Sequence, residues 1–209
     1  MLPAMLPAMP SRFGRLFAKP ASRDDARGRR FVVVIECLLN QNARDRGAAA
    51  YPAVNDAVVA LCALHGVGLL QLPCPEIRFL GPDRARPPGI RIRDRLDTPA
   101  GRQCCREISD EVVDRVRGYL AQGVELLAIL GGNPESPGCA VHPVGSDAEA
   151  PDARSGILMQ TLAEALEAAS IRVPFRGIRD CRPEWLEADL RWLEERFRPS
   201  MSLAEEAAR

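Results

Sequence analysis

Residues 31–36 read Phe-Val-Val-Val-Ile-Glu, a continuous apolar run that decides the fold of this chain. Four β-branched residues in succession, with no polar alternation, are typical of a strand buried on both faces of a parallel sheet. Two similar runs, at residues 67–72 and 124–130, predict strands of the same kind, and residues 171–175 predict a fourth strand.

Helical periodicity fills the segments between these strands. Apolar side chains recur at helical spacing over residues 48–65 and 101–122. Ser155 is placed to cap a third helix that runs to residue 170. The last helix begins with Pro183 in its first turn, and four apolar side chains form the stripe that should pack on the body. They are Leu186, Leu190, Leu193 and Phe197.

This alternation of strands and helices predicts an α/β protein with a three-layer, Rossmann-like open parallel sheet and helices on both faces. We expect a single domain over residues 31–198, because 209 residues of which 46% are hydrophobic suffice for one core. Residues 1–30 predict a disordered or misannotated basic leader, and residues 199–209 a flexible tail. Residues 76–100, rich in Pro, Gly and Arg, predict an irregular excursion, and residues 131–154 a second long loop.

The composition excludes several classes of function. Basic and acidic residues balance at 28 each, and this neutral charge gives no support to a nucleic-acid or membrane-surface partner. No stretch is long and apolar enough to predict a membrane-spanning helix. Lys19, the single lysine, lies in the leader, so the body has no lysine for a P-loop or a Schiff base.

Seven cysteines carry the most informative chemistry of the chain. Their odd number and irregular spacing argue against a disulfide scaffold, so we expect reduced cysteines in a cytoplasmic protein, where such sets serve metals or catalysis. Cys37, Cys74 and Cys139 each follow the end of one of three successive predicted strands. Because ligands bind outside the carboxyl ends of strands in open parallel sheets, these thiols are expected to converge on one site.

The spacing of these three cysteines differs from zinc knuckles and ferredoxin runs, whose ligands cluster in sequence. A metal held by dispersed cysteines must be assembled by the fold. The other cysteines have structural interpretations: Cys62 lies on the apolar face of a helix, and Cys181 in the turn before the last helix. Cys104 and Cys105 lie near a helix start, where a reactive thiol is one interpretation and core packing the favoured one.

The strand-end cysteines lie within three ordered signatures: Glu36-Cys37-Leu38-Leu39-Asn40, Cys74-Pro75-Glu76 and Ser136-Pro137-Gly138-Cys139. This series resembles the three signatures of the thiouracil desulfurase family, and is most similar to its branch of related desulfidases. In that branch the first signature reads Cys-Leu-Leu-Asn and the second follows a Gly-Val-Gly strand, as residues 66–68 do here. The resemblance spans residues 31–175.

The resemblance implies a [4Fe–4S] cluster bound through three cysteines, which match Cys37, Cys74 and Cys139. It implies that the fourth iron has no protein ligand and takes up the sulfur of a thiocarbonyl substrate. The catalytic glutamate and serine of the family match Glu76 and Ser136. An iron–sulfur-dependent desulfidase acting on a small thiolated molecule, such as a thiouracil-like base, is therefore the expected function.

Two departures from the family pattern concern the substrate. Gly138 and Ala140 flank the third cysteine, where the family usually has serine and glycine. Asn40 stands where thiouracil-active members have glycine. The cluster ligands are unaffected by these changes, whereas the identity of the thiolated substrate does not follow from the resemblance.

Elementary chemistry is consistent with these roles. Soft thiolates suit iron, and three of them leave one iron open as a Lewis acid for a soft thiocarbonyl sulfur. Water that attacks the carbon then needs a proton acceptor, for which Glu76 is the candidate; its structural alternative is to fix the loop by accepting backbone hydrogen bonds. Ser136 either orients water or substrate, or forms the turn before Pro137, and the two interpretations stay open.

Other polar groups surround the signatures. Gly131-Gly132-Asn133 allows the backbone to approach a ligand closely, or forms a plain turn. His142 is either a fourth metal ligand or, as favoured, a loop residue. Four arginines of the excursion suit either an anionic substrate or, as favoured, a solvated basic loop. They are Arg78, Arg84, Arg86 and Arg91.

Two other functions compete with the desulfidase. The three cysteines and His142 could hold a structural zinc ion in a non-catalytic module, although structural zinc sites are usually local in sequence. A cysteine hydrolase with Cys139 as nucleophile would need a histidine base, and only His65 and His142 exist. We interpret His65 as a helix-end residue instead.

Overall fold

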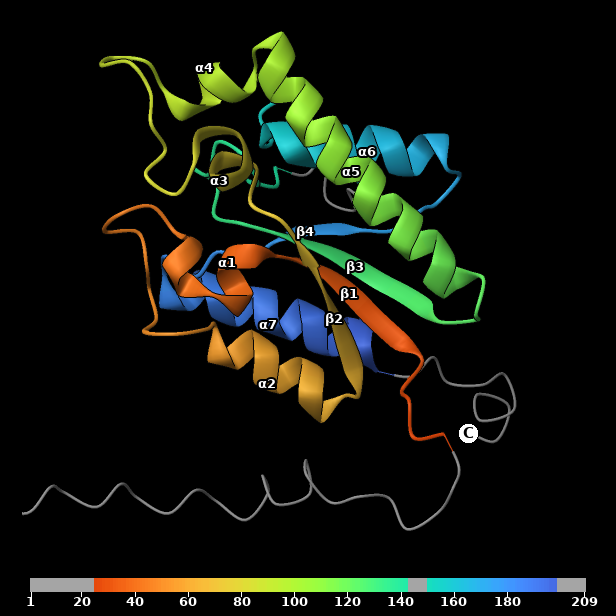
Figure 1. Cartoon of the computed structure of the whole chain (residues 1–209). Coiled ribbons are helices and arrows are strands. Elements are labelled where there is room, and N and C mark those ends of the chain that lie inside the picture. Colours follow the sequence, from red (N-terminus) through yellow and green to blue (C-terminus); the bar gives the residue numbers. More distant parts are fainter. Residues whose placement is uncertain (1–24, 143–149, 199–209) are drawn as a thin grey trace, which may run out of the picture.

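The computed structural model describes residues 25–142 and 150–198 (Figure 1). The predicted tail over 199–209 and all but the last six residues of the predicted leader lie outside the described residues. Within the described part of the chain, no helix combines the length and apolar character needed to cross a membrane.

Four parallel strands form one sheet, as the sequence predicts, but the fourth strand lies at residues 175–177 and shares only Phe175 with the predicted segment 171–175. They are β1 (Arg30–Ile35), β2 (Val67–Leu72), β3 (Glu125–Gly131) and β4 (Phe175–Gly177). The strands pair in the order β2-β1-β3-β4, so the first strand lies in the interior of the sheet and β2 at one edge. Every residue of β1 after Arg30 is buried, which agrees with a strand covered on both faces.

Helices cover both faces of the sheet and complete three layers (Figure 1). The helices α5 (Pro99–Leu120) and α6 (Ile157–Ala168) pack together on one face. The helices α2 (Asp56–Leu64) and α7 (Pro183–Phe197) pack together on the other face. The predicted α/β class with an open parallel sheet is therefore confirmed.

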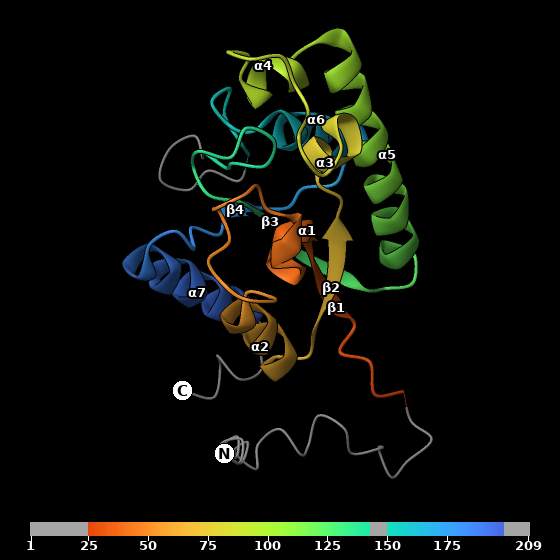
Figure 2. The same cartoon turned by 60° about the vertical axis from the view of Figure 1, so that its left-hand side comes forward.

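Four short helices gather beyond the carboxyl ends of the strands (Figure 2). They are α1 (Glu36–Leu39), the 3₁₀ helix η2 (Gln41–Ala43), α3 (Pro75–Leu80) and α4 (Ile92–Leu96). The segment predicted as an irregular excursion thus contains most of α3 and all of α4. Pro75 occupies the first turn of α3, where its missing N–H has no helical partner to lose.

Two helices begin later than the sequence pattern predicts. Helix α2 starts at Asp56 and not at residue 48, because Asn55 is extended and its side-chain oxygen caps the amide of Val58 at 3.1 Å. Helix α6 starts at Ile157, and Ser155 does not cap it. The Ser155 hydroxyl instead accepts a hydrogen bond from the amide of His142 at 2.8 Å.

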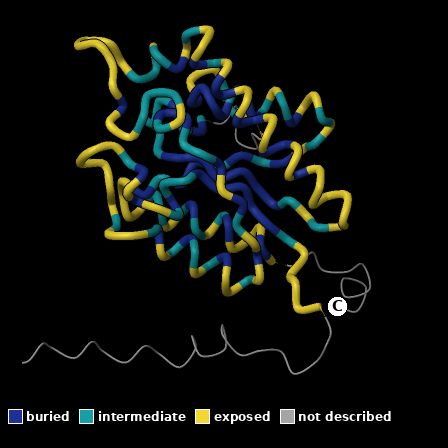
Figure 3. Tube along the Cα trace, in the orientation of Figure 1, coloured by how far each residue is buried: buried dark blue, intermediate teal, exposed yellow. Residues whose placement is uncertain are grey.

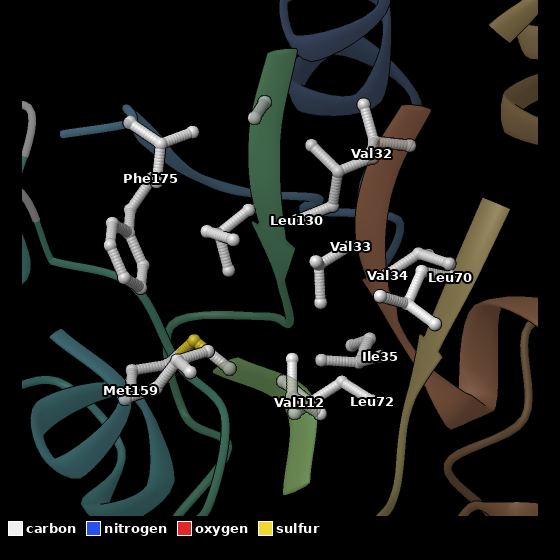
Figure 4. Packing of buried hydrophobic residues seen from close by; sticks show 14 of the residues in the cluster. Val32, Val33, Val34, Ile35, Leu70, Leu72, Val112, Leu130, Met159 and Phe175 are labelled. Atoms are coloured by element: carbon white, nitrogen blue, oxygen red, sulfur yellow. The ribbon is translucent and has the colours of Figure 1, made fainter. Parts of the chain in front are cut away.

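The core extends over both faces of the sheet, and Figure 4 shows the part between the strands and the helices α5 and α6. Ile35 and Leu72 lie beside Val112 of α5, and the ring of Phe175 extends toward Met159 of α6. Fully burying an aliphatic or aromatic side chain of this size stabilises a fold by about 1.5–3 kcal/mol. Figure 3 shows buried strands at the centre and exposed residues on loops and outer helix surfaces.

Candidate metal centre

The sheet order places a topological switch point between β1 and β3 at their carboxyl ends. From β1 the chain crosses to β2 by α2 on one face, and from β3 it crosses to β4 by α6 on the other face. The connections of two neighbouring strands therefore diverge, and open α/β sheets bind ligands at such a switch point. Cys37 lies in α1 directly after β1, and Cys139 lies in the loop after β3.

Direct contacts join the three loops that carry the predicted cysteines. The amide of Cys74 donates to Glu36 Oε2 at 2.8 Å, which ties the second signature to the first. A methyl group on Gly138 would lie 2.7 Å from Pro75 Cγ, so the third signature packs against the second. The structure thus brings the three signatures together at the carboxyl ends of the strands.

The backbone beside Cys139 tolerates no side chain. A methyl group on Gly132 would lie 2.8 Å from Cys139 Sγ and 3.2 Å from Ile35 Cδ1. The amide of Gly132 donates to the Cys139 carbonyl at 2.7 Å. The Cys139 thiol occupies the space of the missing side chain, so Gly132 is required here for packing within the protein.

Burial is the main influence on all three thiols. It raises the pKa of Cys37, although the positive charge of Arg44 opposes the shift. It raises the pKa of Cys74 to about 11, against the amides of Ile77 and Glu76. It raises the pKa of Cys139 well above its ordinary value, and the neighbouring thiols Cys37 and Cys74 raise it further. All three are therefore neutral thiols at pH 7, and binding a metal here must release protons.

The predicted ligands differ from a preformed metal site. Within the described residues, no three His, Cys, Asp or Glu side chains form a group that could hold a metal ion. The three cysteines are soft donors of the kind that iron–sulfur clusters use, and contacts between their loops bring the segments that carry them together.

Glu76 lies buried in α3, two residues beyond Cys74. Its Oε2 accepts a hydrogen bond from Arg84 Nε at 2.8 Å, and Arg84 Nη2 donates to the Ala43 carbonyl at 2.6 Å. Oε1 has no hydrogen bond among the described residues and faces Gly138 of the third signature. The alternative role of Glu76, accepting backbone hydrogen bonds, is not what the contacts show.

Arg84 corrects one prediction, because it is 3% exposed and does not belong to a solvated loop. The other three arginines named with it in the prediction are exposed, as predicted. Arg78 pairs with Glu111, and Arg91 pairs with Asp94. Arg86 donates to backbone carbonyls.

The Ser136 hydroxyl contacts the third cysteine directly. Its Oγ lies 2.9 Å from Cys139 Sγ and accepts a hydrogen bond from the Cys139 amide at 3.2 Å. These contacts agree with the turn-forming interpretation. They also mean that the hydroxyl is already bonded to Cys139, one of the predicted metal ligands. The His142 ring lies 2.8 Å from the Pro134 carbonyl through Nε2, as a loop residue would.

A buried polar cluster beside Cys37 was missed by sequence reasoning. Asp180, three residues after β4, accepts from Arg44 Nη2 at 2.6 Å, from Asn133 Nδ2 at 2.9 Å and from Asn55 Nδ2 at 3.2 Å. The one signal for Asp180 in the sequence is its place shortly after the fourth predicted strand. Nothing local marks Arg44, which lies between the first predicted strand and the first predicted helix.

The remaining cysteines take the structural roles predicted for them. Cys62 and Cys105 are fully buried, and burial raises the pKa of each to about 12. Cys104 is 8% exposed, and both Cys104 and Cys105 lie beyond the first turn of α5, away from its N-terminal amides. Cys181 is exposed.

Comparisons with known proteins give one distant relative. The chain is 25% identical over 145 residues to a protein of Methanocaldococcus jannaschii that is described only as uncharacterized. The alignment covers 69% of this chain and 83% of the relative. No family model matches the chain, and no solved structure matches it.

Proposed function

We propose that this protein is an iron–sulfur-dependent desulfidase of the cytoplasm that removes sulfur from a small thiocarbonyl compound. One observation carries the proposal: the three loops that bear Cys37, Cys74 and Cys139 contact one another at the switch point of the sheet, and the second of them carries the buried Glu76. Cys37, Cys74 and Cys139 would hold a [4Fe–4S] cluster, in line with the resemblance to thiouracil desulfurases. When bound, such a cluster would supply a Lewis-acidic iron for the soft sulfur of the substrate.

Glu76 takes the proton of the water that attacks the thiocarbonyl carbon, and later returns a proton to the departing sulfur. Its ion pair with Arg84 fixes Oε2, so Oε1 is the oxygen left to accept that proton. Ser136 holds Cys139 in place through its hydroxyl. Water supplies oxygen, the C=S bond breaks, and sulfur leaves as hydrogen sulfide, so the reaction needs no oxidant or reductant.

Anaerobic reconstitution with iron and sulfide tests the cluster. The wild-type protein should turn brown, bind about four irons per chain and release sulfide from members of a panel of thiolated bases, nucleosides and thioamides. Cys74→Ala should lose both the colour and the sulfide release. Cys62→Ala, which removes a thiol from the core, should keep both. Colourless wild-type protein that carries one zinc ion per chain would instead establish the zinc module.

The role of Glu76 has its own test. Glu76→Gln keeps the size of the side chain and a hydrogen-bond acceptor for Arg84, so the brown absorption should match that of the wild type. Sulfide release should fall by a factor of about 10² or more, the usual contribution of a general base. A variant that stays brown and turns over at the wild-type rate would remove Glu76 from the reaction.

A further inference from the structure

The guanidinium of Arg84 is engaged through all three of its nitrogens. Nε donates to Glu76 Oε2 at 2.8 Å, Nη1 donates to the Pro82 carbonyl at 3.0 Å, and Nη2 donates to the Ala43 carbonyl at 2.6 Å. The side chain of Arg84 is 4% exposed and that of Glu76 is 10% exposed. These bonds hold the planar guanidinium in one orientation, in which a single nitrogen meets the carboxylate.

The partners of Arg84 belong to different segments at the carboxyl end of the sheet. Arg84 itself lies between α3 and α4. Ala43 is the last residue of η2, which follows the first signature, and Glu76 lies in α3 with the second signature. The Glu76 carboxylate is therefore held relative to the chain that continues from Cys37 as well as to its own helix.

The backbone of Arg84 adopts a conformation that side chains disfavour. Its φ is +48°, in the left-handed region where the Cβ atom crowds the following carbonyl oxygen. Among the described residues, two other non-glycine residues have a positive φ, Arg29 and Ser170, and both are exposed. Strain of this kind persists where the surroundings fix it, and it clusters at functional sites. At Arg84 the buried polar contacts of the side chain hold the strained turn.

A second arginine–glutamate pair in the same region has a different geometry. Arg78 of α3 donates to both carboxylate oxygens of Glu111, at 2.8 Å and 2.6 Å, in the two-pronged arrangement typical of arginine. Arg84 contacts only Oε2 of Glu76, and Oε1 takes part in no hydrogen bond among the described residues. A proton acceptor needs one oxygen that is free and aimed at the proton. The Arg84 pair meets this need, whereas two-pronged pairing would engage both oxygens.

We infer that Arg84 is a positioning residue that presents Oε1 of Glu76 to the water attacking the thiocarbonyl carbon. This inference rests on the proposed function and adds a residue outside the three signatures. A general base must lie within hydrogen-bond reach of the proton that it takes. A displacement of about 1 Å can cost about 10²-fold in rate. Because Arg84 acts on Glu76 and not on the substrate, its loss should lower kcat and leave KM unchanged.

Steady-state kinetics of anaerobically reconstituted variants test the inference. Arg84→Lys keeps a positive charge beside Glu76 but has no planar fork to bond the two carbonyls. Its iron content, brown absorption and KM should match those of the wild type, while kcat should fall about 10- to 100-fold. Arg78→Met removes the arginine of the exposed pair and should leave kcat and KM unchanged.

A double variant shows whether Arg84 acts through Glu76. Glu76→Gln removes the proton acceptor, so adding Arg84→Lys should cause no further fall in kcat. If Arg84→Lys lowers kcat by the same factor in both backgrounds, Arg84 acts independently of Glu76 and the inference is wrong.

Denaturant unfolding of the metal-free proteins provides a readout that does not depend on turnover. Arg84→Met leaves the Glu76 carboxylate buried without its partner, so adding Glu76→Gln should restore part of the lost stability. If Glu76→Gln destabilises the Arg84→Met protein as much as it destabilises the wild type, the pair does not form in solution and the inference fails. Should Arg84→Met not fold, the kinetics of Arg84→Lys decide the matter alone.

The outcomes separate this inference from the proposed function. If the wild-type protein releases sulfide and Arg84→Lys does so with an unchanged kcat, the Arg84 inference is wrong and the proposed function stands. If the wild-type protein releases no sulfide, the proposed function fails and the inference fails with it.

Discussion

The two ends of the sheet contrast in what they hold. At the carboxyl end lie three thiols and two buried ion pairs, Arg44–Asp180 and Arg84–Glu76. At the amino end lies a pocket of about 530 Å³, lined by the first residues of β1 and β2 and by Tyr119. Its arginines are already engaged: Arg30, for example, donates to two backbone carbonyls.

The contrast shows that a cavity and a cluster of chemically reactive side chains can occupy different parts of one fold. A cavity needs only imperfect packing, whereas buried charges persist only where partners satisfy them. The carboxyl end has such partners because four strand ends send their loops to one place. We therefore place the chemistry at the carboxyl end, and the following experiments probe this assignment.

The largest effect should come from closing the space beside Cys139. In Gly132→Ala, the new methyl group would overlap Cys139 Sγ and press on Ile35. We expect most of the iron and the brown absorption after reconstitution to be lost. Gly118→Ala is the matched control: Gly118 is exposed in α5 with open space around it, and the change should stabilise the fold by about 0.5–1 kcal/mol. Normal iron content in Gly132→Ala would refute the packing argument.

A smaller effect should come from the isolated thiol of Cys62, near the amino end. Burial alone raises its pKa to about 12, with no charged neighbour involved. Between pH 9 and 11 the unfolded chain loses this proton and the folded chain keeps it, so the stability is complete below pH 9 and falls as the pH rises. The expected loss is up to about 1.4 kcal/mol per pH unit.

Denaturant unfolding at several pH values measures this slope. Cys62→Ala should show a shallower decline above pH 9 than the wild type. Cys181→Ala, which removes an exposed thiol, should decline as the wild type does. Equal slopes in all three proteins would show that Cys62 does not stay protonated in the fold.

The smallest effect should come from the pocket at the amino end. The rings of Phe31 and Tyr119 lie 5.1 Å apart and tilted, an arrangement worth about 0.5–1.5 kcal/mol beyond its buried area. Tyr119→Ala should therefore lower the free energy of unfolding by about 1–2 kcal/mol. Iron content and sulfide release should not change. A loss of iron or of sulfide release would show that the amino end of the sheet also contributes to the site.

Much of the fold could be predicted from the sequence, because its signals were local. Strand β2 has the bounds expected of it, since Gly66 and Pro73 flank a short apolar run. Helix α2 was predicted too long, because Ala48–Ala50 favour a helix by propensity alone. In the structure the side-chain oxygen of Gln41 accepts from the amide of Ala50 at 2.9 Å, a tertiary contact that holds the segment in another conformation.

In the candidate site, too, only the residues with a local signal in the sequence could be predicted. The positions of Cys37, Cys74 and Cys139 after successive strands were visible in the sequence, because parallel strands end at one edge. The pair of Arg44 and Asp180 was not, because 136 residues separate them and only the order of the strands makes them neighbours. Arg84 was predicted to be solvated because it lies in a segment rich in Pro, Gly and Arg. In the structure its guanidinium is buried and pairs with the Glu76 carboxylate.

The brevity of β4 has a mechanical consequence. It pairs only with Ile129, Leu130 and Gly131, the last residues of β3. The sheet is thus widest where the thiol-bearing loops depart and narrower at its opposite end. Local opening should start at the narrow end, where fewer cross-strand bonds must break. Amide protons of Gly131 and Gly177 should then be among the slowest to exchange with solvent, and the loops that carry the thiols would stay assembled while the far end of the sheet breathes.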